Sequence, residues 1–175
     1  MSRWTAADVA RVIAEVSRSG AVPNTTLVPL SFVRELNPEL AEAEIAAGLE
    51  TVCFFEMPLR VVSALNKREH HMARARRVKK ERAATAATLL AHRDEIPRVE
   101  DTPGLEVRMT RIGPRLLDSD AVGGALKGCR DETAAFLGVD DGPTSPVRWE
   151  HKQERGPWGV YRVRVEFRAP RREGR

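Results

Sequence analysis

The segment from Leu116 to Asp141, LLDSDAVGGALKGCRDETAAFLGVDD, constrains the fold more than any other part of the chain. Apolar residues recur in it at helical spacing, which predicts a helix over residues 120–137. Apolar and polar residues alternate before it, over residues 105–112, and after it, over residues 147–154. Such alternation is typical of β-strands. The pattern therefore predicts a strand, a helix and a strand in succession.

Three further elements complete the expected fold. Residues 51–57 are short, apolar and aromatic, which predicts a strand buried on both faces. Residues 161–167 show the cleanest alternation in the chain, and the turn at 156–159 predicts a hairpin between this strand and the preceding one. A long helix follows Lys67 and continues past Leu90. Together these elements predict an α/β or α+β fold, a small mixed sheet of about four strands with two helices against it.

The chain divides into three parts on this reading. Residues 1–50 contain two helical patterns, the second running through Leu49, and predict a helical N-terminal extension. Residues 51–168 form the expected sheet domain. Residues 169–175 are a basic tail, and we expect the chain to fray from about Arg168 onward.

Composition limits the class of protein. Hydrophobic residues make up 42% of the chain, enough for a core, but no apolar run approaches the roughly 18 residues of a membrane span. The first residues lack the apolar region of a signal peptide. Cys53 and Cys129 lie within apolar patterns and lack metal-ligand spacing. We therefore expect a cytoplasmic protein with two reduced core cysteines and no membrane partner.

The net charge of +4 is distributed unevenly. Residues 1–50 contain four basic and seven acidic residues, whereas the remainder contains 25 basic and 18 acidic residues. A basic body of this kind is compatible with a polyanionic partner. Surface solubility explains the charge equally well, so both readings stay open.

The strongest charge feature is the run KREHHMARARRVKKER over residues 67–82. One reading is a solvated helix whose charges face water. The other is a surface that follows DNA phosphates, favoured because few glutamates match the cations. The candidate DNA-binding residues are Lys67, Arg68, Arg74, Arg76, Arg77, Lys79, Lys80 and Arg82.

The acidic segment carries the candidate chemistry. On a helix, Asp120, Lys127 and Asp131 share the side opposite the apolar stripe. The segment begins with Asp118 and Asp120 and closes with a second acidic pair, Asp140 and Asp141. A structural reading makes these residues a helix cap, an ion pair and an acidic turn. The alternative is a metal site, since crowded carboxylates need a compensating charge.

The sequence resembles the RusA-type Holliday junction endonucleases, especially their phage-borne relatives. The resemblance rests on LDSDAVGGALKGCRDETAAFLGVDDG, on VRWEHKQERG with the last strand, and on the upstream SALNKREHHMARARRVKKER. It covers roughly residues 51–167.

The resemblance implies a small homodimeric α/β nuclease that binds four-way DNA junctions in recombination and repair. It implies Mg²⁺, with Mn²⁺ as a substitute, held by Asp118 and Asp120 and by Asp141 of the later acidic pair, with Asp140 a weaker candidate. Lys127 corresponds to the lysine that such enzymes use. The arginines of the last strand and the basic helix would then contact the DNA backbone.

Three positions depart from the family pattern. Ala121 stands where an asparagine usually follows the second aspartate, Lys127 lies farther along the helix, and Gly142-Pro143 follows the second acidic pair. A binding protein that has lost catalysis is therefore the alternative function. A helix of about 17 residues is about 25 Å long, so Asp118 and Asp141 flank its two ends. Sharing a metal requires either that the helix is shorter and the loop after it folds back or that Asp141 acts across a dimer.

Overall fold

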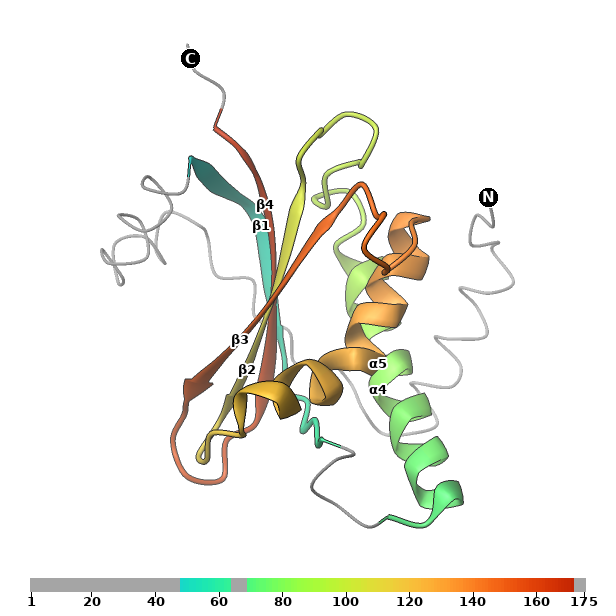
Figure 1. The fold of residues 1–175 in the computed structure, drawn as a ribbon, viewed down its shortest axis with the longest axis vertical. Helices are drawn as coiled ribbons and strands as arrows, with labels where there is room; N and C mark the ends of the chain where they lie inside the picture. The colour runs from blue at the N-terminus through green and yellow to red at the C-terminus, as the bar shows by residue number, and fades with distance from the viewer. Residues whose placement is uncertain (1–47, 64–68, 172–175) are drawn as a thin grey trace.

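The computed structural model describes residues 48–63 and 69–171. These residues form an α+β fold in which two helices lie on one side of a four-stranded mixed sheet (Figure 1), as predicted. The expected helices within residues 1–47, and the candidate DNA-binding residues Lys67 and Arg68, lie outside the described residues. No helix in the described ranges has the length and apolar character needed to cross a membrane.

The sheet is built around a strand–helix–strand unit. The elements in chain order are β1 (Leu49–Met57), α4 (His71–Ala91), β2 (Glu106–Gly113), α5 (Ser119–Leu137), β3 (Arg148–Arg155) and β4 (Arg162–Pro170). The strands lie in the order β1-β4-β2-β3. β2 and β3 are parallel, with α5 connecting them, whereas β4 is antiparallel to both β1 and β2.

The predicted hairpin between β3 and β4 is wrong. β2 lies between these two strands, so the turn after β3 passes the end of β2, where the Gly156 N–H donates to the Gly113 carbonyl at 2.9 Å. A Cβ atom at position 156 would lie 2.9 Å from Ile112 Cγ2, which is too close. This explains why a glycine stands where the chain passes the end of β2. Alternation indicates which face a residue occupies but carries no information about which strand lies beside it.

Two predicted boundaries also change. β1 begins at Leu49, which the sequence pattern assigns to a helix. β4 continues to Pro170, and Arg168 is only 2% exposed and pairs with Glu106 on β2. The start of the expected fraying tail is therefore part of the sheet, because a buried ion pair anchors it.

The core lies between the sheet and the two helices. Phe55, Phe167 and Met109 face the helices from three strands, and Leu89 of α4 and Leu126 of α5 meet them, all fully buried. The Phe55 ring lies 6.0 Å from the Phe167 ring and stacks on His92 at 5.5 Å. This packing fixes α5 against β2 and β3, and it thereby fixes the position of every acidic residue on the helix.

Both cysteines are buried free thiols, as predicted. Desolvation raises the pKa of each to about 12. Because the thiolate is the reactive form, neither cysteine should react with a thiol reagent at about pH 8 while the protein is folded. In denaturant we expect two thiols per chain to react, measured by absorbance; fast labelling of the native protein would contradict this packing.

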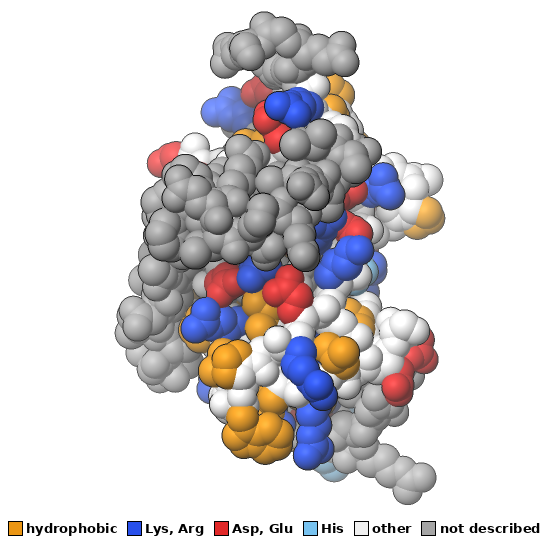
Figure 2. Space-filling model, turned by 90° about the vertical axis from the view of Figure 1, so that its left-hand side faces the viewer, with side chains coloured by type: hydrophobic (Ala, Val, Ile, Leu, Met, Phe, Trp, Pro, Cys, Tyr) orange, Lys and Arg blue, Asp and Glu red, His pale blue; other side chains and the backbone are white. Residues whose placement is uncertain are grey.

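The opposite face of the sheet is charged. Figure 2 shows Lys and Arg side chains beside Asp and Glu side chains on the part of this face that is visible. Arg164 pairs with Glu56 on the neighbouring strand β1 and reaches across β2 to Glu154 on β3, and Arg108 on β2 pairs with Glu150 on the neighbouring β3. Cross-strand pairs of opposite charge stabilise a sheet face. Carboxylates therefore match the β4 arginines, and we do not assign DNA contact to them.

Candidate functional site

α5 has the two faces that the sequence predicts. Val122, Leu126 and Cys129 are buried in the core, while Asp120 and Lys127 are exposed on the other side. Asp118 is the residue before the helix, and Gly138 ends it in the left-handed conformation with φ of 70°. Ala121 stands where the RusA-type endonucleases, which the sequence resembles, usually have an asparagine. It is 1% exposed and belongs to the buried side of α5.

The side chains of the first acidic pair make no polar contact with another described side chain. Asp118 occupies the cap position, yet its side chain makes no capping hydrogen bond. Both Asp118 and Asp120 are exposed, and neither side chain forms a hydrogen bond or ion pair with another described residue. The partial positive charge at the helix N-terminus favours carboxylates there. These two side chains are therefore available to a cation.

The second acidic pair is placed differently from the first. The chain after Gly138 folds back along α5, so that Asp141 lies beside the middle of the helix rather than beyond its end. Arg130 donates two hydrogen bonds to Asp141 Oδ2, at 2.8 and 3.1 Å, and Lys127 Nζ lies 3.9 Å from the same atom. Asp140 is exposed and lies outside this contact. The loop thus folds back, but α5 spans Ser119–Leu137 and is not the shorter helix that the same alternative required.

Charge dominates the state of Asp141. Partial burial raises the pKa of Asp141. The hydrogen bonds and charge of Arg130 and the charge of Lys127 lower it by more, so the pKa lies below its ordinary value. Lys127 also pairs with Asp131 at 3.1 Å. Asp141 is thus an ionised carboxylate held by two cations.

The fold-back does not unite the two acidic pairs within one chain. Seven residues of helix, about 10 Å, separate Asp120 from Lys127. Across residues 48–63 and 69–171, no three His, Cys, Asp or Glu side chains converge as a metal site. The proposed ligand set of Asp118, Asp120 and Asp141 thus remains a prediction that requires either movement of Asp141 or a second subunit.

The basic helix α4 combines structural and exposed cations. Arg77 pairs with Glu69 and Glu81 at 3.0 and 2.7 Å, and Arg82 pairs with Glu132 of α5 at 2.8 Å. These two candidates therefore stabilise the helix and its packing on α5. The other described candidates, Arg74, Arg76, Lys79 and Lys80, have exposed side chains.

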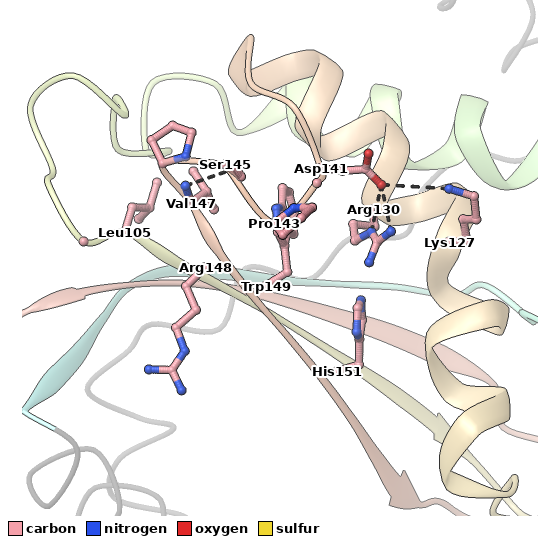
Figure 3. Close-up of a pocket in the computed structure, with 13 residues that line it drawn as sticks. Leu105, Lys127, Arg130, Asp141, Pro143, Ser145, Val147, Arg148, Trp149 and His151 are labelled. Atoms are coloured by element: carbon pink, nitrogen blue, oxygen red, sulfur yellow. Dashed lines mark hydrogen bonds and ion pairs between the residues drawn. The ribbon is translucent and has the colours of Figure 1, made fainter.

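A cleft of about 940 Å³ lies between α5, the following loop and β3 (Figure 3). His151 points from β3 toward Arg130, and Trp149 points toward Pro143 of the loop. Lys127, Asp141 and Arg148 also line it. Sequence reasoning missed Arg130, Trp149 and His151 as site residues, although alternation had placed Trp149 and His151 on one face of their strand.

Two buried polar atoms in this cleft lack partners. Trp149 Nε1 and His151 Nε2 make no hydrogen bond with any residue in the described ranges. Desolvation and the nearby Arg130 lower the pKa of His151, outweighing the opposite effect of Glu150, so its ring is neutral at pH 7.

No protein-family model, curated protein or solved structure matches the chain.

Proposed function

We propose that this protein is a Mg²⁺-dependent endonuclease that cuts branched DNA, acting as a homodimer on four-way junctions or related branches. One observation carries the proposal: Asp118 and Asp120 are exposed and free of any described protein partner at the start of a well-packed helix. A carboxylate pair left available in this way suits a hard cation. The resemblance to the RusA-type endonucleases supplies the reaction class.

The residues fit the chemistry of phosphodiester hydrolysis. Asp118 and Asp120 would hold Mg²⁺ or Mn²⁺ through their oxygens. A cation bound there supplies an activated water and neutralises charge on the phosphoryl group. Lys127 lies two turns farther along the same exposed side of α5, where its ammonium group can hold a phosphate of the same strand. Asp141 would complete the ligand set after leaving Arg130, or from the other subunit of a dimer.

A specific observation favours a second candidate, a branched-DNA-binding protein without catalysis. Asp141 is engaged by Arg130 and Lys127, and Ala121 provides no side-chain amide to orient the acidic pair. Such a protein would bind junctions with a steep salt dependence and leave them uncut.

One gel experiment separates the two candidates. A labelled four-way junction and a linear duplex of the same sequence are incubated with the protein, with and without Mg²⁺. The nuclease proposal expects paired nicks in the junction only when Mg²⁺ is present, with the duplex intact. Retention of the junction without any nick, in Mg²⁺ or Mn²⁺, supports the binding protein, whereas absence of retention at physiological salt contradicts both.

The exposed cations of α4 give a separate prediction about DNA affinity. Changing both Arg74→Gln and Arg76→Gln should reduce the slope of log affinity against log salt by about 0.9 for each phosphate that the variant no longer neutralises. Fluorescence anisotropy with a labelled junction measures this slope. Arg93→Gln is the control, because Arg93 has a 70% exposed side chain in the turn beyond α4. An equal reduction of slope in the control would contradict a DNA-binding role for α4.

A further inference from the structure

The cleft beside α5 contains an oxyanion site that the chain itself fills. The carboxylate of Asp141 lies between Arg130 and Lys127, with its Oδ2 atom accepting two hydrogen bonds from the Arg130 guanidinium. A carboxylate and a phosphate present similar oxygens to an arginine. The two cations are therefore placed to bind an oxyanion.

The lining of the cleft has more donors than its resident carboxylate uses. Trp149 Nε1 and His151 Nε2 are buried without a hydrogen-bond partner among the described residues, and both residues line the cleft. The Trp149 atom is always a donor, whereas the His151 atom is a donor in the Nε2–H tautomer. An unpartnered buried N–H is unfavourable, and natural proteins keep few of them. The ionisable lining residues are three cations, the third being Arg148, and one carboxylate, so the cleft has a net positive charge when His151 is neutral.

We propose that Arg130, together with Lys127, the Trp149 indole N–H and His151 in its Nε2–H tautomer, forms a subsite for one phosphate of a DNA strand, which enters in exchange for Asp141. The proposal deepens the proposed function and rests on it only in taking DNA as the ligand. Phosphate entry would leave Asp141 without its cations. The same event would then bind the strand and free the Asp141 carboxylate.

If a phosphate takes the place of Asp141, removing the Asp141 charge should increase the affinity for DNA. Asp141→Asn removes the competing carboxylate, so the variant should bind a junction about 5-fold more tightly in the absence of metal. Arg130→Gln removes the phosphate-binding fork and should weaken binding about 10-fold. In the Arg130→Gln background, Asp141→Asn should no longer increase affinity, because no site remains for the phosphate to compete for.

The experiment measures junction affinity by fluorescence anisotropy with EDTA present, for the wild type, the two single variants and the double variant. Asp94→Asn is the control for long-range charge, since its side chain is 96% exposed and lies outside the cleft. Arg130→Lys keeps the charge without the fork and should bind with intermediate affinity. Circular dichroism verifies that each variant is folded.

Two results would overturn the exchange. The first is an equal gain in affinity for Asp141→Asn and Asp94→Asn, which reduces the effect to net charge. The second is a gain for Asp141→Asn that persists unchanged in the Arg130→Gln background.

A parallel titration with inorganic phosphate, followed by thermal unfolding, separates a free-phosphate site from one that needs DNA: stabilisation that depends on Arg130 supports the subsite without any DNA. Cleavage assays in Mg²⁺ test the nuclease itself, so the two proposals can fail independently.

Discussion

Exchange of Asp120 for asparagine should abolish Mg²⁺-dependent cleavage of a four-way junction while leaving junction binding intact. The side chain is exposed in the first turn of α5 and forms no hydrogen bond or ion pair within the described part of the chain. An amide of the same shape therefore leaves the fold undisturbed but removes a negative ligand from the proposed metal site. Removing a residue that merely supports a metal ligand typically reduces metal affinity or activity by about 10- to 100-fold, so removing a direct ligand should cost at least about 100-fold.

Single-turnover cleavage of a labelled junction measures this effect. Asp101→Asn makes the same charge change at an exposed turn residue before β2 that lines neither the cleft nor the proposed metal site, and it should cut at the wild-type rate. Affinity of the Asp120→Asn variant measured in EDTA should equal or exceed that of the wild type, since a negative charge near phosphate has been removed. Wild-type cutting by Asp120→Asn would refute the assignment of the site.

Truncation of Phe55 to alanine should cause a large loss of stability. Phe55 is fully buried at the centre of the layer between sheet and helices, against Phe167 and His92. Removing such a ring loses the transfer free energy of its atoms and leaves a cavity, which together cost about 3–5 kcal/mol. A domain of this size is stable by only about 5–15 kcal/mol, so the variant should be close to unfolding at about 37 °C.

Urea denaturation followed by circular dichroism gives the free energy of unfolding for this comparison. Val52→Ala is the control, because Val52 belongs to the same strand but is 39% exposed; the free energy of unfolding should fall by less than about 1 kcal/mol. If the two variants lose equal stability, the core does not lie between β1 and the helices.

Periodicity carried the prediction of individual elements because it reflects burial directly. Residues 105–112 and 147–154 alternate since one face of each strand packs toward α5 and the other carries mostly polar and charged side chains. The face of α5 that holds Asp120 and Lys127 followed from the same argument, as both are exposed opposite Leu126. Strong local patterns of this kind require no knowledge of the neighbours.

Periodicity could not predict which strands lie next to one another in the sheet. Nothing in the alternation of β3 and β4 indicates that β2 is inserted between them, because any partner of matching face satisfies the pattern. The sequence also does not show whether a basic residue has an ion-pair partner on another element. Arg77 and Arg82 read as members of a basic run, and only the packing of α4 on α5 places Glu132 beside Arg82.

The sequence by itself determined the elements, the apolar stripe of α5 and the exposure of its acidic side. Only the tertiary structure decided where the second acidic pair lies. The chain after Gly138 folds back because α5 must return to a parallel strand beside β2, and this return brings Asp141 against Arg130 instead of against Asp118. A contact between a loop and the middle of a helix depends on the path of the chain in space, and local spacing does not record that path.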